Sequence, residues 1–127
     1  MSNLSIPETE KSPEIILNSD GLISIKGKAI PDNAFHFFAP VLDWVTEYCT
    51  KPAPITKVEL ALEYYNTSSS KILISILRNL DHLHKTGASK ILTQWFFETD
   101  DDDMEESGQD FQRMVSMPIT MVAVESL

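Results

Sequence analysis

The chain of 127 residues has the size of one domain, and a chain of this length buries about two-thirds of its unfolded surface without disulfides or metals. Apolar residues make up 43% of the sequence and charged residues 23%, which is typical of a globular protein and excludes a disordered chain. The formal net charge of -9 repels nucleic-acid phosphates and anionic lipids, so we expect neither nucleic acid nor a membrane as a partner. No basic segment followed by an apolar stretch occurs at the N-terminus, and we expect a cytoplasmic protein.

We expect a single domain over residues 1–127, with residues 1–13 as a mobile or loosely docked arm, because serine, glutamate, lysine and proline are mixed there without periodicity. Two apolar runs follow, at residues 14–17 and 22–27. The four residues between them end in an Asp-Gly pair, which readily adopts the positive φ angles of a hairpin turn. This pattern predicts an antiparallel pair of strands.

Pro31-Asp32-Asn33 offers a capping side chain, and apolar and aromatic residues recur at helical spacing from Phe35 onward, so we predict a first helix over residues 33–50. Pro40 lies inside this pattern and removes a backbone hydrogen bond, so we expect a kink or a broken first turn. The next element, residues 57–65, alternates apolar and polar side chains, with Tyr64 on the apolar face. A strand of this kind predicts a sheet with helices mainly on one side, because doubly covered parallel strands are apolar throughout.

The rest of the chain predicts a second helix over residues 71–85 that ends at Gly87, then a strand over residues 91–97. A short acidic helix between residues 101 and 115 and a last strand over residues 119–124 complete the chain. The order β-β-α-β-α-β-α-β indicates an α/β fold with a mixed sheet of about five strands, since helical crossovers favour parallel neighbours.

The hydroxyl cluster Asn66-Thr67-Ser68-Ser69-Ser70 lies between the predicted strand and the second helix. The first N–H groups of a helix are unpaired and carry the positive end of its dipole, so this place stabilises a phosphoryl group. We therefore interpret the cluster as a candidate phosphorylation switch. Serine and threonine are also common helix caps, and a purely structural role for these hydroxyls stays open.

Carboxylates are dense at residues 98–106, where the consecutive aspartates are Asp100, Asp101, Asp102 and Asp103. A calcium loop starting at Asp103 would place Gly108 correctly at its sixth position, but Met114 would then occupy the twelfth, where a glutamate is required. A solvated helix start is the preferred interpretation, and a docking surface for a basic partner is an alternative.

Catalytic patterns are absent from the sequence. It contains no His-x-x-x-His pair, no Gly-x-Ser-x-Gly elbow and no glycine-rich phosphate loop. We therefore predict neither enzymatic activity nor a cofactor. A small metal-dependent enzyme built on residues 100–106 remains the alternative from another class.

These features together resemble the SiaC family of bacterial regulatory phosphoproteins, which is related in fold to the STAS domains of anti-sigma-factor antagonists. The similarity covers nearly the whole chain, and the Asn-Thr-Ser-Ser turn at residues 66–69 is its most specific element. The other matching segments are Ile6-Pro7-Glu8-Thr9, Ser12-Pro13, Pro31-Asp32-Asn33, Leu42-Asp43-Trp44-Val45, Trp95-Phe96-Phe97-Glu98 and Gly108-Gln109-Asp110-Phe111.

The resemblance implies a STAS-like fold in which Thr67 is phosphorylated by a dedicated kinase and dephosphorylated by a metal-dependent serine/threonine phosphatase. It also implies that the unphosphorylated form binds and activates a diguanylate cyclase, and so controls cyclic-di-GMP and biofilm formation. Regulation of a sigma factor is the alternative, although STAS antagonists commonly carry Asp-Ser where this chain has Asn66-Thr67. We expect partners to contact Asn66, Ser68, Ser69 and Ser70, together with the acidic segment Asp100-Asp101-Asp102-Asp103.

Overall fold

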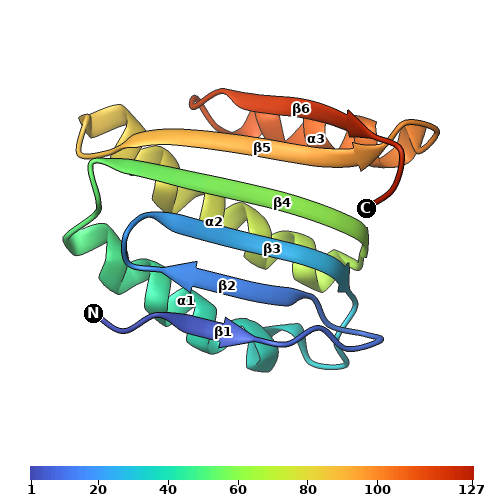
Figure 1. The fold of residues 1–127 in the computed structure, drawn as a ribbon, viewed down its shortest axis with the longest axis horizontal. Helices are drawn as coiled ribbons and strands as arrows, with labels where there is room; N and C mark the ends of the chain where they lie inside the picture. The colour runs from blue at the N-terminus through green and yellow to red at the C-terminus, as the bar shows by residue number, and fades with distance from the viewer.

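In the computed structural model, which describes residues 1–127, six strands lie in the sheet in the order in which the chain makes them (Figure 1). They are β1 (Leu4–Ile6), β2 (Glu14–Asn18), β3 (Leu22–Ala29), β4 (Ile55–Tyr65), β5 (Lys90–Glu98) and β6 (Ile119–Val124). The first three strands pair antiparallel, whereas β3 to β6 pair parallel. The predicted mixed sheet and its N-terminal hairpin are confirmed, with one strand more than expected.

The additional strand, β1, corrects the expectation of a loosely docked arm over residues 1–13. Leu4–Ile6 pairs with β2, and the indole N–H of Trp44 donates to the carbonyl oxygen of Ser2 at 2.9 Å. Further along, Ser12 is buried and its hydroxyl lies 2.5 Å from that of Thr9. A strand of three residues at a sheet edge is too short to produce a visible alternation, so it could not be predicted from the sequence pattern.

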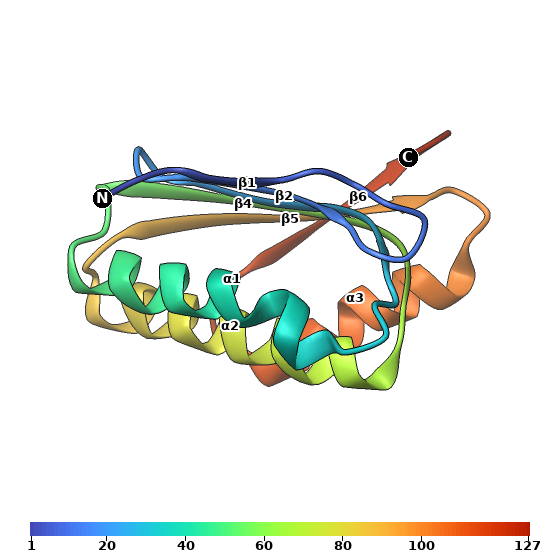
Figure 2. The ribbon, with the colours of Figure 1, turned by 90° about the horizontal axis from the view of Figure 1, so that it is seen from below.

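All three helices cover the same face of the sheet and leave the other face open (Figure 2), as the alternation in β4 predicted. They are α1 (Ala34–Thr50), α2 (Thr67–Thr86) and α3 (Asp102–Met114), which follow β3, β4 and β5 respectively. Because these three strands are parallel, all three helices begin at the same end of the sheet. None of the helices is both long enough and apolar enough to cross a membrane.

Helix α1 passes through Pro40 without interruption, so the expected break in its first turn does not occur. The capping side chain expected within Pro31-Asp32-Asn33 is that of Asn33, whose Oδ1 accepts from the N–H of His36 at 3.0 Å. Pro40 removes the usual donor to the carbonyl of His36, and both residues are exposed. Water can bond to the freed carbonyl there, which makes the proline tolerable.

The core fills the space between the sheet and the helices, and Trp95 of β5 is among its largest fully buried side chains. The indole N–H of Trp95 donates to the carbonyl of Met104 in α3 at 2.9 Å. A Cβ on Gly108 would lie 2.7 Å from Cδ1 of Trp95 and 2.6 Å from Cε of Met121, so only glycine allows α3 to approach this closely. These contacts fix the position of α3 on the sheet.

A β-bulge near the end of β4 reverses the alternation of its last residues. Leu62 pairs with Gly27 of β3, but the next residue of β3 pairs with Tyr64, so Glu63 is the extra residue. Tyr65 consequently turns toward the helices and packs against Phe111, while 59% of Tyr64 is exposed. The sequence pattern, which placed Tyr64 on the apolar face, is therefore corrected.

Candidate functional site

The hydroxyl cluster forms the first turn of α2, because this helix begins at Thr67 rather than near residue 71 as the sequence indicated. Asn66 is the N-cap: its Oδ1 accepts from the N–H of Ser69 at 2.9 Å, and its carbonyl accepts from the N–H of Ser70 at 3.0 Å. The N–H of Asn66 in turn donates to the carbonyl of Ala29 in β3 at 3.1 Å. Capping is therefore done by Asn66, and no hydroxyl of the cluster is needed for it.

The four hydroxyl groups that follow Asn66 have different environments. Those of Thr67 and Ser68 are exposed and have no hydrogen-bond partner within the protein. Ser70 is partly buried, and its hydroxyl donates to the carbonyl of Thr67 at 2.7 Å. Ser69 is fully buried with an unpaired Oγ, so the expectation that its side chain contacts partners is corrected.

The start of α2 favours negative charge. No acidic residue lies in its first turn, and the N–H groups of Thr67 and Ser68 have no carbonyl one turn earlier in the helix to bond to. These donors carry the positive end of the helix dipole, and Lys71 follows one turn later. A phosphoryl group on either exposed hydroxyl would lie in a favourable field.

An apolar groove of about 280 Å³ lies beside this turn, between α2 and α3. Its lining includes Tyr65 and Phe111, whose ring centroids are 6.0 Å apart. The other lining residues are Ser70, Lys71, Ile74, Asp110 and Met114. Met114 is 49% exposed, so part of its apolar side chain is open to solvent at the groove. This groove could not be predicted from the sequence, because the residues that line it come from segments far apart in the chain.

The acidic segment starts α3. Asp101 is the N-cap and accepts from the N–H of Met104 at 3.1 Å, while Asp102 and Asp103 lie in the first turn, where carboxylates complement the helix dipole. Asp100, Asp102 and Asp103 are exposed, and Asp101 is partly buried. No group of three or more histidine, cysteine, aspartate or glutamate side chains is placed to hold a metal ion. The segment thus has the geometry of a solvated helix start.

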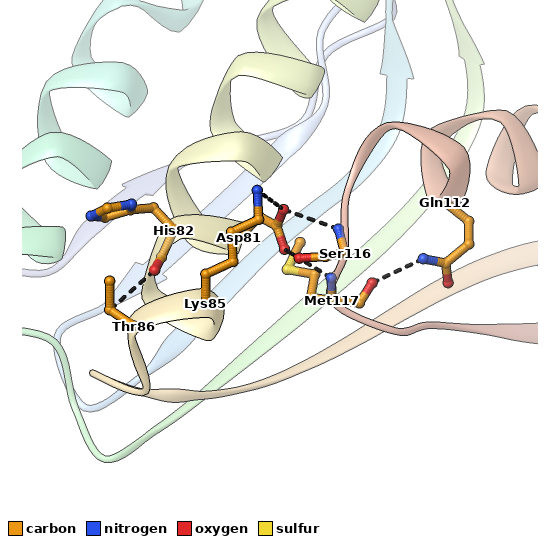
Figure 3. A network of polar contacts seen from close by, with 7 residues as sticks. All are labelled: Asp81, His82, Lys85, Thr86, Gln112, Ser116 and Met117. Carbon is orange, nitrogen blue, oxygen red and sulfur yellow. Dashed lines mark hydrogen bonds and ion pairs between the residues drawn. The ribbon is translucent and has the colours of Figure 1, made fainter.

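A buried carboxylate ties the C-terminal half of α2 to the loop after α3 (Figure 3). Asp81 is 3% exposed; its Oδ1 accepts from the N–H of Met117 at 2.8 Å and from the hydroxyl of Ser116 at 2.9 Å. Its Oδ2 accepts from the N–H of Ser116 at 3.0 Å and lies 3.5 Å from Nζ of Lys85. We call this set of contacts the Asp81 latch.

The charge of the Asp81 latch follows from the balance of two effects. Burial by itself would raise the pKa of Asp81, but the hydrogen bonds from Ser116 and Met117 and the charge of Lys85 outweigh it and hold the pKa below its usual value. The carboxylate is therefore ionised at neutral pH. The signal for this latch in the sequence is an aspartate one helical turn after Leu77, on the apolar stripe of α2.

A one-sided mixed sheet that presents exposed hydroxyls at a helix start, next to an apolar groove, defines a small α/β regulatory domain. The model of the SiaC family regulatory phosphoproteins matches residues 6–124, and the chain belongs to this family. It is therefore a bacterial regulatory protein rather than an enzyme.

This chain is similar to a relative and to solved structures over nearly its full length. An uncharacterized protein of Pseudomonas aeruginosa strain UCBPP-PA14 is 30% identical over 124 residues, which are 97% of this chain and 98% of the relative. The structure of SiaC of P. aeruginosa is 29% identical with a TM-score of 0.88, covering 98% of this chain and 100% of that one. SiaC in complex with the diguanylate cyclase SiaD, whose activator it is, matches with a TM-score of 0.87, 29% identity and coverage of 95% and 99%.

Proposed function

We propose that this chain is a partner-switching regulator that binds and activates a diguanylate cyclase when Thr67 is unmodified and releases it when Thr67 is phosphorylated. The observation that carries the proposal is the exposed Thr67 hydroxyl at the first position of α2, where Asn66 alone satisfies the cap. The cyclase as effector is supported by the similarity to SiaC, which is an activator of the cyclase SiaD in P. aeruginosa.

Thr67 is favoured over its neighbours by accessibility and by sequence context. Ser69 is buried and Ser70 is bonded to the backbone, which leaves Thr67 and Ser68 as the accessible acceptors. Thr67 is the threonine of the Asn-Thr-Ser-Ser turn through which the chain resembles its family. We assign the transfer to a dedicated cytoplasmic kinase and its reversal to a metal-dependent serine/threonine phosphatase.

The switch follows from charge. Phosphorylation adds about -1.5 to -2 charges and three strong acceptor oxygens to a surface that is now neutral at Thr67. An interface that buries the hydroxyl would have to desolvate this dianion, and an acidic partner surface would also repel it. A loss of about 3 kcal/mol weakens binding more than a hundredfold, which is enough for a switch.

Coexpression of the chain with the genes that neighbour its own tests the proposal. Intact-mass measurement and peptide mapping should find one phosphoryl group on Thr67 when the kinase is present and none when the phosphatase is added. Thr67→Ala should abolish the modification, whereas Ser68→Ala, the matched control at the other exposed hydroxyl, should retain it. Phosphate on Ser68 instead, or capture of an anti-sigma factor rather than a cyclase, would contradict the assignment.

A further inference from the structure

We propose that Lys71 is the intramolecular counter-ion of a phosphate on Thr67, and that phosphorylation thereby withdraws Lys71 from the rim of the groove between α2 and α3. This role rests on the phosphorylation of Thr67 proposed above. It adds a residue that stabilises the modified state and links the modification to the adjacent groove.

The helix places Lys71 correctly for this role. Thr67 and Lys71 are four residues apart in α2, so their side chains are neighbours on one face. Side chains of a helix lean toward its N-terminus, which directs the ammonium group back over the first turn. An anionic residue four positions before a lysine is also the more favourable order of such a pair.

Lys71 is available because no other group in the protein engages it. It is exposed and forms no ion pair, whereas Lys85 and Arg113 do. No acidic residue lies in α2 before Asp81, more than two turns further along. The phosphate would therefore be the first anion on this face of α2 within reach of Lys71.

Acidic side chains on neighbouring elements do not compete with a phosphate on Thr67 for Lys71. Asp110 of α3 lines the same groove as Lys71, but it already pairs with Arg113. Glu63 of β4 is exposed and lines a different surface hollow, together with Lys28 of β3. Lys71 is the only basic residue among those that line the groove beside α2.

The pairing changes what a partner meets at the groove. In the unmodified chain, Lys71 offers a free positive charge at the rim of an apolar groove, which suits an apolar side chain flanked by a carboxylate. In the phosphorylated chain, the ammonium group is engaged by the phosphate, and a partner carboxylate would face a negative charge instead. Phosphorylation would therefore act on the groove as well as on the surface at Thr67 itself.

The test uses the full chain with phosphothreonine encoded at position 67, so that no kinase is required. Titration by ³¹P NMR at low salt gives the second pKa of the phosphate in four chains: the unchanged chain, Lys71→Gln, Lys71→Arg and Lys90→Gln. Lys90 is a matched control, because it is exposed and begins β5 at the end of the sheet opposite the start of α2. A nearby cation favours the dianion, so Lys71→Gln should raise the pKa by about 0.3 unit.

The chains with Lys71→Arg and Lys90→Gln should keep the pKa of the unchanged chain, and the rise seen with Lys71→Gln should vanish in concentrated salt. Equal pKa values for Lys71→Gln and Lys90→Gln would overturn the role of Lys71. That result would leave the phosphorylation of Thr67 untouched, because the phosphate is encoded. Conversely, absence of phosphate on Thr67 in the native cells would refute the proposed function without altering the titration.

Discussion

The Asp81 latch makes a quantitative prediction about stability. In Asp81→Asn, the amide oxygen can still accept the two hydrogen bonds that Oδ1 now accepts, but the NH₂ group in place of Oδ2 faces the N–H of Ser116, a donor that Asp81 now satisfies. Hydrogen bonds to a charged group are worth about 1.5–3 kcal/mol, and leaving a buried donor unpaired costs about 1–3 kcal/mol. We therefore expect Asp81→Asn to lower the free energy of unfolding by about 2 kcal/mol at pH 7. The contribution of Lys85 to this value is small, because 63% of its side chain is exposed.

The pH dependence of this loss has a definite sign. Folding lowers the pKa of Asp81, so the carboxylate contributes stability above the unfolded value of about 3.9 and loses it as the pH falls through the lower folded value. The difference between the unchanged chain and Asp81→Asn should therefore be full at pH 7 and shrink below about pH 4. Asp81→Asn lacks this titration, because its amide does not ionise.

Urea unfolding followed by circular dichroism at several pH values measures both effects. Asp43→Asn is the matched control, because Asp43 is exposed in the middle of α1 and forms no hydrogen bond or ion pair through its side chain. Its effect should stay within about 0.5 kcal/mol. If Asp81→Asn were no more destabilising than Asp43→Asn, or if its effect grew in acid, the latch would not work as described.

Three further changes test other parts of the structure. Gly108→Ala should destabilise the chain by about 1–3 kcal/mol and shift the fluorescence of Trp95 toward that of an exposed indole, because the new methyl group would collide with that ring. Asn66→Ala removes the side chain that caps α2 and should lower the free energy of unfolding by about 1 kcal/mol in urea titrations. Asn66→Asp should retain most of the stability that this cap contributes. Thr67→Asp should weaken cyclase activation in a turnover assay, while Thr67→Ala should preserve it, because only the former adds charge at the surface that we propose binds the cyclase.

Each of these predictions can fail clearly. An unchanged fluorescence spectrum for Gly108→Ala, with Ser107→Ala as control, would mean that α3 does not depend on close contact with the sheet. Equal stability of Asn66→Ala and the unchanged chain would mean that another group caps α2. Equal activation by Thr67→Asp and Thr67→Ala would rule out charge as the basis of the switch.

The order of the main elements and their placement on one face could be predicted from periodicity, because each is long enough to show it. The start of α2 could not, since serine and threonine favour turns in isolation, whereas Asn66 and the packing of Ser69 keep them helical here. The orientation of Tyr64 could not be predicted either, because a bulge is defined by the pairing of two strands and does not show in the sequence of one. The groove and the Asp81 latch each join segments about 35 residues apart or more, which local patterns do not report.

The most direct test of the central claim is the affinity of the chain for the diguanylate cyclase that we propose as its effector. Calorimetric titration would compare the unmodified chain with the chain that carries phosphothreonine at position 67. We predict binding of the unmodified chain and at least a hundredfold weaker binding of the phosphorylated one. Equal affinities of the two forms, or tighter binding of the phosphorylated form, would contradict the account.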